Sequence, residues 1–215
     1  MKKFFLTLAL AAVATSAFAQ IEGLSAGAGY LTNTRKVTAT YNNTSDSDKQ
    51  EFGGFYAGVS YTVLHVGPGI GITPGIYFSN LSYKKDADAV GGVRSGSENN
   101  ISVPVNFSYK LDLLPGTLAL APYLGPTFIF GLSSKDQYAL KNHTDITDNY
   151  GDNSDYGRFN VAVGGGIALD IVDMIRVTLG YNLGLLNLYT GDNSGNTKYS
   201  YKNNTGFNFG VAYLF

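Results

Sequence analysis

Large apolar residues recur at every second position over much of this chain. In the final stretch the alternating large residues are Phe207, Phe209, Val211, Tyr213 and Phe215. A period of two is expected of a β-strand whose two faces meet different surroundings. The same pattern predicts eight strands, over residues 22–32, 53–64, 69–83, 100–111, 117–133, 157–170, 175–189 and 205–215.

The connections between these predicted strands alternate in length. Long, polar connections rich in Asn, Asp, Ser and Gly cover residues 33–52, 84–99, 134–156 and 190–204. Short connections cover residues 65–68, 112–116 and 171–174. Transmembrane β-barrels have short periplasmic turns and long extracellular loops, although a soluble barrel or sandwich can also have uneven loops.

The two faces of the predicted strands differ in the size of their side chains. Residues such as Phe55 and Val59 are large and apolar, whereas Gly58 and Ser60 between them are small or polar. The interior of an eight-stranded barrel is only just wide enough for side chains to fill, so only the small set fits inside. A sandwich could bury the large set, but about a quarter to a third of its outer surface would then be charged. We therefore predict an all-β fold, an eight-stranded antiparallel up-and-down transmembrane β-barrel with its large residues toward lipid.

Aromatic residues near the predicted strand ends fit interfacial girdles, although tyrosine is also common in soluble strands. These residues are Tyr30, Phe52, Tyr61, Tyr109, Tyr156, Tyr189 and Tyr213.

The first nineteen residues have the layout of a secretory signal peptide. Lys2 and Lys3 precede an apolar run, and small residues follow up to Ala19. We expect cleavage before Gln20, which leaves residues 20–215 as one barrel domain. The chain has no cysteine and a net charge of −1, so it lacks the basic character of a nucleic-acid-binding protein.

Three charged residues fall on the small face of the predicted strands. They are Lys110, Asp170 and Arg176, and all are expected in the lumen near the periplasmic end. Charges in a narrow lumen need partners or water. A structural salt-bridge network is the simpler interpretation, and a gated path for protons or ions is the alternative.

The long connection at 134–156 holds the residues with most potential for chemistry. His143 lies near Asp145 and Ser154, as a hydrolytic dyad of an outer-membrane lipase or protease would require. No nucleophile motif accompanies them. The acidic residues Asp148, Asp152 and Asp155 lack the spacing of an EF-hand calcium loop. We predict no catalytic, metal or cofactor site.

Several stretches resemble the small outer-membrane β-barrel domains, the porin family, of Bacteroidetes. They are ISVPVNFSYKL, LAPYLGPTFIFGL, RFNVAVGGGIALDI, VTLGYNLGLLNL and the terminal GVAYLF. The resemblance implies a location in the outer membrane, and the short connections at one end of the barrel predict that both termini are periplasmic. The resemblance also implies that Phe215, with Tyr213 and Val211, is the signal read by the barrel-assembly machinery.

The resulting functional hypothesis is a non-enzymatic outer-membrane barrel in contact with lipid. Its extracellular loops would serve a structural, adhesion or binding role toward an unknown ligand, because specificity concentrates on loops held by a rigid scaffold. A narrow porin or transporter of small apolar solutes is the alternative. A lipid-modifying enzyme that uses His143 is the third hypothesis.

Overall fold

The computed structural model describes residues 22–42, 44–66, 69–87, 92–140, 143–152, 154–191 and 197–215. The predicted signal peptide lies outside these residues. The strands are β1 (Leu24–Tyr41), β2 (Thr44–Tyr61), β3 (Leu64–Val66), β4 (Ile70–Ala87), β5 (Gly92–Tyr109), β6 (Leu111–Leu114), β7 (Leu118–Leu140), β8 (His143–Asp148), β9 (Phe159–Ile171), β10 (Ile175–Gly184) and β11 (Thr197–Leu214).

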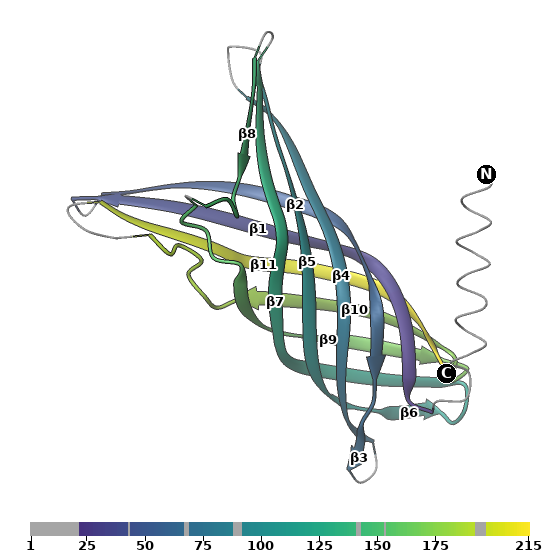
Figure 1. The fold of residues 1–215 in the computed structure, drawn as a ribbon. Helices are drawn as coiled ribbons and strands as arrows, with labels where there is room; N and C mark the ends of the chain where they lie inside the picture. Colours follow the sequence, from purple (N-terminus) through teal and green to yellow (C-terminus); the bar gives the residue numbers. More distant parts are fainter. Residues whose placement is uncertain are drawn as a thin grey trace, which may run out of the picture.

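Eight of these strands form a closed antiparallel ring (Figure 1). The order around the ring is β1, β2, β4, β5, β7, β9, β10 and β11, and β11 pairs again with β1. Because each ring strand has a partner on both sides, the backbone in the ring can satisfy its hydrogen bonds internally. The prediction of an eight-stranded up-and-down barrel is confirmed.

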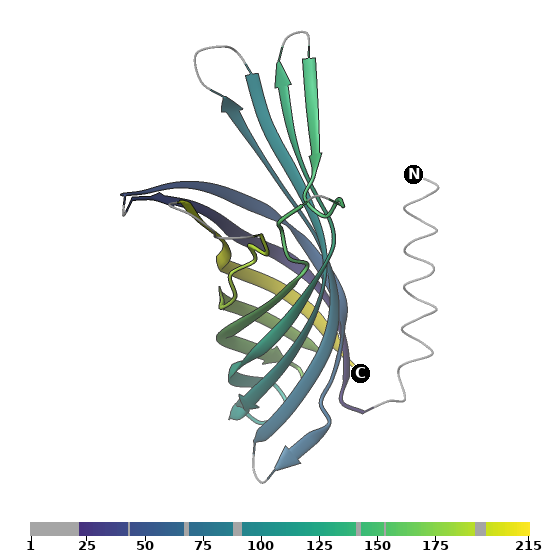
Figure 2. The same cartoon turned by 60° about the vertical axis from the view of Figure 1, so that its left-hand side comes forward.

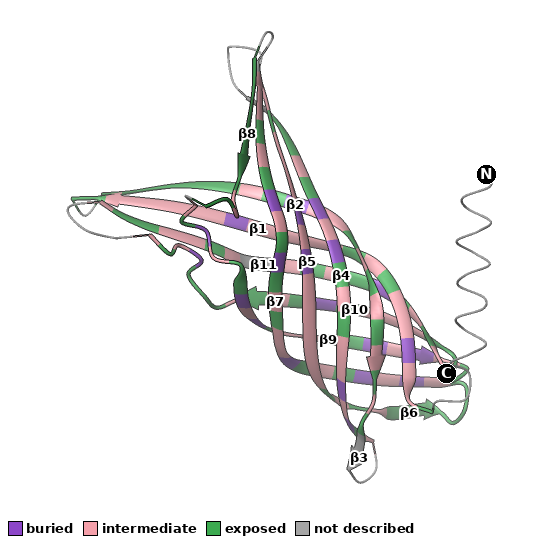
Figure 3. Cartoon of the chain, in the orientation of Figure 1, coloured by how far each residue is buried: buried purple, intermediate pink, exposed green. Residues whose placement is uncertain are grey.

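The ring is apolar outside and polar or small inside. Phe207 is 62% exposed and Leu179 is 59% exposed, whereas Ala121 and Ala168 on the inner face are almost completely buried. Figure 3 shows exposed positions alternating with intermediate or buried ones along several ring strands. This is the arrangement that the sequence predicted for a barrel surrounded by lipid. Among the described residues, no helix is long and apolar enough to cross a membrane.

Three tyrosines point into the narrow interior, and each lies in register with a glycine of the next strand. Tyr56 pairs with Gly29, Tyr77 with Gly58 and Tyr123 with Gly166. Gly180 is next to Gly166 in the ladder, and a Cβ on Gly180 would collide with the Tyr123 hydroxyl. The missing side chains leave room for the phenol rings, so these three tyrosines fit inside the narrow barrel.

The short connections gather at one end of the barrel, where β1 begins and β11 ends (Figure 1). The strands β3 and β6 lie there and pair with β4 and β7. The turn between β9 and β10 places Val172 and Asp173 at positive φ, 54° and 53°. The Val172 N–H donates to the carbonyl of Thr117 over 2.8 Å, which ties this turn to the neighbouring one.

At the other end, the segments expected to be long loops are largely β-strand. β1, β2 and β11 continue past the ring as one sheet, residues 36–41, 44–50 and 197–203, which we call the first projecting sheet. β4, β5, β7 and β8 form the second projecting sheet, residues 83–87, 92–98, 134–140 and 143–148. Pairing between β2 and β4 stops at Gly53 and Ser82, and beyond this point the two sheets diverge (Figure 2).

The packing of Tyr123 on glycine leads to a test by double substitution. Gly180→Ala should lower the stability of the barrel by about 1–3 kcal/mol, because the new methyl group meets the Tyr123 hydroxyl. In a Tyr123→Phe background the hydroxyl is gone, so the cost should fall by about 0.5 kcal/mol or more. Stability is measured as the temperature at which the folded form changes to the unfolded mobility on a detergent gel.

Gly151→Ala serves as the control, since the nearest atom to its Cβ would be the Asp148 carbonyl oxygen at 3.3 Å. Equal costs of Gly180→Ala in the two backgrounds would contradict the packing described for Tyr123.

Candidate functional site

A buried arginine lies where the first projecting sheet leaves the ring. Arg35 is only 3% exposed, and its guanidinium forms an ion pair with Glu98 of β5, which is 1% exposed. A second ion pair joins Arg35 to Asp136 of β7 over 2.9 Å. Arg35 also donates to the Ser134 hydroxyl over 2.9 Å. We call these four residues the Arg35 cluster, and they tie the first projecting sheet to the second.

Aromatic rings enclose the guanidinium of Arg35. Its carbon lies 4.7 Å from the ring centre of Phe52 and 5.0 Å from that of Tyr156, both within the range of cation–π attraction. Phe52 and Tyr156 were predicted to belong to the interfacial girdles, and that prediction is wrong because both are buried inside. They instead shield the ion pairs of Arg35 from water.

The hydrogen bonds of the Arg35 cluster continue into neighbouring residues. Asp136 accepts from the Asn149 side chain over 2.8 Å and from the Tyr83 hydroxyl over 3.3 Å. Two buried atoms, Arg35 Nε and Glu98 Oε2, have no protein partner. The guanidinium of Arg35 therefore faces the carboxylates of Glu98 and Asp136, which leaves a net negative charge. The hydrogen-bond donors around Asp136 partly offset this charge.

The tyrosines over the cluster stay neutral at ordinary pH. Burial, with the nearby Glu98, raises the pKa of Tyr150 to about 12. Burial and Glu98 likewise raise the pKa of Tyr156 well above its usual value. The Tyr156 hydroxyl lies 3.5 Å from Glu98 Oε1, as a neutral donor would.

Local irregularities in two strands accompany this cluster. The pairing of β1 with β11 shifts by one residue between Thr34 and Arg35. The pairing of β5 with β7 shifts between Asn99 and Asn100, next to Glu98. Because a β-bulge redirects the side chains after it and bends its strand, the shift in β7 accounts for the inward aim of Ser134 and Asp136. Both shifts favour the divergence of the two sheets.

A separate ion pair, between Asp170 and Arg176, lies near the end of the lumen where the short turns are. Asp170 and Arg176 are in register on β9 and β10, and two hydrogen bonds of 2.6 and 2.8 Å join them. Asp170 is 2% exposed. Lys110 lies apart from this pair, outside the strands, with a side chain that is 39% exposed and 2.9 Å from Asp173. The structure thus brings together two of the three charges that the sequence placed in the lumen.

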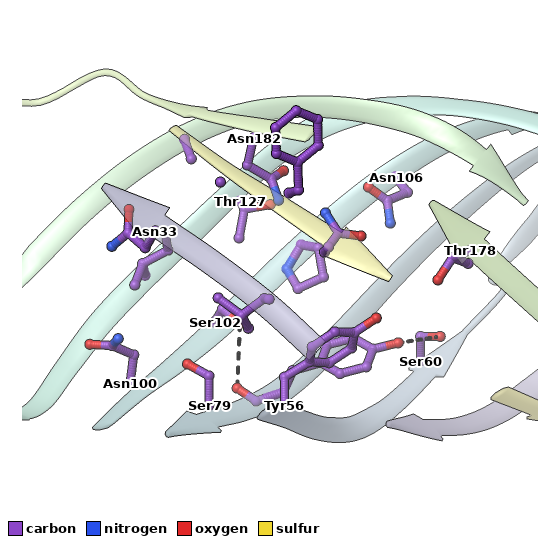
Figure 4. Close-up of a pocket in the computed structure, with 18 of the residues that line it drawn as sticks. Asn33, Tyr56, Ser60, Ser79, Asn100, Ser102, Asn106, Thr127, Thr178 and Asn182 are labelled. Carbon is purple, nitrogen blue, oxygen red and sulfur yellow. Dashed lines mark hydrogen bonds between the residues drawn. The ribbon is translucent and has the colours of Figure 1, made fainter. Parts of the chain in front are cut away.

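Between the two charged clusters lies a cavity of about 250 Å³ (Figure 4). Amide and hydroxyl side chains line it, among them Asn33, Asn100 and Asn182, together with Tyr56 and with apolar residues such as Leu81. This cavity is a space in which the lumen could hold a molecule other than protein.

The residues considered for catalysis and metal binding lie at the surface. His143 Nε2 is 2.7 Å from Asp145 Oδ1, and both side chains are well exposed on β8. The Ser154 hydroxyl bonds instead to the Asn149 carbonyl and to the Tyr156 N–H. Within the described part of the chain, no three His, Asp or Glu side chains converge as a metal site would need.

The predicted assembly signal lies at the end of β11. Val211 and Tyr213 are exposed on the outer face at 48% and 41%. The Tyr213 ring is 4.9 Å from that of Phe215, whose N–H donates to the Leu24 carbonyl over 2.9 Å. These residues are accessible on the outer face, and their role in assembly stays a prediction.

The sequence pattern did not reveal the Arg35 cluster, because its members lie in segments assigned to loops. One signal was present: Leu31, Asn33 and Arg35 continue the inward-facing period of two beyond the end predicted for the first strand. An arginine in such a series indicates a strand that extends past the membrane with a charge turned inward.

Ring closure, an apolar outer belt and a polar lumen together define a membrane-spanning β-barrel. The chain belongs to the outer membrane protein β-barrel domain family, whose model matches residues 5–215. It is therefore an outer-membrane protein. No curated protein sequence matches it significantly.

Solved structures of small outer-membrane barrels are similar in fold. The attachment invasion locus protein Ail of Yersinia pestis is 13% identical, with a TM-score of 0.42 over 91% of this chain and 100% of that one. Neisserial surface protein A is 12% identical, with a TM-score of 0.43 over 90% and 98%. A major outer membrane protein of Thermus thermophilus is 15% identical, with a TM-score of 0.46 over 86% and 99%. These likenesses are too distant to assign a role.

The burial of Arg35 leads to a prediction for its removal. Arg35→Ala should destabilise the barrel by about 3–5 kcal/mol, because Glu98 is left buried without its counterion. Restoring a neutral environment with a second substitution, Glu98→Gln, should recover part of this loss. The measurement is the gel conversion temperature, with Lys36→Ala, on the other face of β1, as the control. A single Arg35→Ala variant as stable as the control would refute the role given to the cluster.

Tyr156 should contribute to the loss of stability at alkaline pH. Its pKa is raised in the folded protein above the ordinary value of 10.0, so below pH 10 its contribution is fully present. Above pH 10 the unfolded chain loses this proton first, and stability falls as the pH rises. Tyr156→Phe should make the conversion temperature less sensitive to pH above 10. An unchanged slope would show that Tyr156 does not carry this effect.

Proposed function

We propose that this protein is a non-enzymatic binding protein of the cell surface, anchored by its barrel. In this proposal the short turns and both termini are periplasmic, after removal of residues 1–19 as a signal peptide. The projecting sheets then lie outside the cell. Lipid surrounds the ring, and the barrel-assembly machinery inserts it by way of Phe215, Tyr213 and Val211.

The observation that carries this proposal is the pair of diverging sheets with open edges. Residues 44–52 of β2 pair with β1 alone, since pairing with β4 begins only at Gly53. On the facing edge, residues 83–87 of β4 pair with β5 alone. Backbone N–H and C=O groups along these edges are open to a further strand.

An edge of this kind binds extended segments by strand addition, in which main-chain hydrogen bonds give affinity and side chains give specificity. The free edge of β2 carries Asp46, Asp48 and Lys49, all exposed. Charges on an edge discourage pairing with further copies of the same chain. The partner we propose is therefore an extended segment of another extracellular protein.

Transport is the competing function, and the lumenal cavity is the observation that favours it. Conductance across a planar lipid bilayer separates the two. A closed, binding barrel gives no stepwise current, whereas regular current steps from the purified protein would favour a pore.

Shortening the first projecting sheet tests the binding function. The variant lacks residues 38–47, and a two-residue Asn-Gly turn joins Val37 to Asp48, which are paired in β1 and β2. The probe is a displayed library of random twelve-residue peptides, selected on the protein in lipid nanodiscs. Peptides with alternating apolar and polar residues should be enriched on the native protein and lost on this variant.

A companion variant tests the facing edge of β4 by removing residues 85–94, which end in the paired positions Lys85 and Arg94. Both variants should keep the gel shift on heating, since the ring is intact. If no peptides are enriched, or if enrichment survives both truncations, the binding function is wrong.

A further inference from the structure

We infer that the lumenal cavity is a binding site for an uncharged, polyhydroxylated molecule of about the size of one sugar ring. This site goes beyond the proposed function, because it lies inside the barrel and does not involve the open sheet edges. The shape of the cavity wall, the chemistry of its lining and the position of its entrance each support this assignment.

The cavity exists in part because glycines stand in place of larger inward residues on the wall formed by β1 and β11. Gly27 and Gly206 lie on this wall and line the cavity. On the opposite strands Ser102, Asn106 and Thr127 also carry short side chains. At ~30 Å³ for each water molecule, 250 Å³ holds about eight waters, which one sugar ring would displace in large part.

The lining is rich in neutral groups that both donate and accept hydrogen bonds. Among the described residues that line the cavity, none is Asp or Glu and two are Arg. Arg176 is neutralised by its two bonds to Asp170, and Arg158 lies at the exposed end of the lining. Amides and hydroxyls match the hydroxyl groups of a polyol, each of which also donates and accepts. The asparagines of the lining include Asn33, Asn100, Asn106, Asn160, Asn182 and Asn208.

Two of the amide groups have unused hydrogen-bonding capacity. The side-chain oxygen of Asn160 is buried without a partner, and the residue is only 4% exposed. Asn203 also lines the cavity, and its side-chain oxygen is likewise buried without a partner. Buried polar atoms of this kind are costly unless water or a ligand supplies the missing bond. Both oxygens are hydrogen-bond acceptors, so a ligand with hydroxyl donors would complement them.

We place the entrance at the part of the rim formed by β9 and β10, between the two projecting sheets. β9 begins only at Phe159 and β10 ends at Gly184, so neither takes part in a projecting sheet. The lining continues from the buried Asn160 to Arg158, which is exposed. Arg158 donates to the Tyr150 carbonyl over 3.0 Å and stacks on the Tyr150 ring at 4.8 Å. Arg158 and Tyr150 thus line the cavity at this end.

The test measures binding of free monosaccharides to the folded protein in nanodiscs, which avoids sugar-based detergents. Glucose, galactose, mannose and N-acetylglucosamine are titrated separately, with glucuronic acid as the anionic and cyclohexanol as the apolar comparison. Saturation-transfer NMR reports on the ligand, and the ¹⁵N-labelled asparagine side-chain signals report on the cavity. We expect saturable binding of at least one neutral sugar, with shifts of the Asn160 signals.

Asn160→Leu and Asn182→Leu should each weaken this binding tenfold or more, and Asn182→Leu still tests the site if the Asn160 variant does not fold. Asn80→Leu is the matched control, since Asn80 bonds to Asn99 and does not line the cavity. Binding should also persist when residues 38–47 are removed, which separates this site from the peptide-binding function.

Three results would overturn the inference. The first is the absence of saturation with every neutral sugar. The second is binding that Asn160→Leu and Asn182→Leu leave unchanged. The third is binding confined to glucuronic acid or cyclohexanol, because the site would then recognise a charge or an apolar surface and not neutral hydroxyl groups.

Discussion

The structure depends on closing an antiparallel ring of eight strands in surroundings that contain no water. Backbone hydrogen bonds must then be satisfied from strand to strand, and the apolar side chains must face outward. The same closure fixes a narrow interior, which explains why the inner face is built from Gly, Ala, Ser, Thr and Asn. The inward tyrosines are compatible with this limit only because glycines lie beside them.

Where the strands leave the ring, their surroundings change from hydrocarbon to water, and ring closure is no longer required. The two sheets no longer need each other there, and they separate beyond Gly53 and Ser82. The Arg35 cluster lies at this point of separation and joins β1 to β5 and β7. It anchors both sheets to the rim of the barrel, while the bulges beside it allow them to bend apart. The proposed binding surfaces thus depend on a buried ionic cluster that contacts Phe52 at the base of one open edge and Tyr83 at the base of the other.

The sequence was most informative where lipid meets one face of a strand. There the contrast between faces is large, and residues such as Phe55 and Gly58 predicted both the strands and their orientation. In the projecting sheets both faces meet water, so residues 38–49 show no such contrast and were assigned to a loop. The Arg35 cluster could not be predicted either, because Arg35, Glu98 and Asp136 lie on three strands and meet only through register. An aromatic residue near a strand end did not by itself predict contact with lipid, since Phe52 and Tyr156 pack on the Arg35 cation instead.

The inward position of Tyr56 has a consequence for how the barrel is completed. β1 and β11 are neighbours in the ring but come from opposite ends of the chain, so their pairing carries a large loss of chain entropy. The Tyr56 ring starts on β2, lies against Gly29 of β1 and reaches Gly210 of β11. It thereby spans the joint between first and last strand. Ring closure is expected to be a late folding step, and the contact of Tyr56 with Gly210 can form only after β11 has paired with β1.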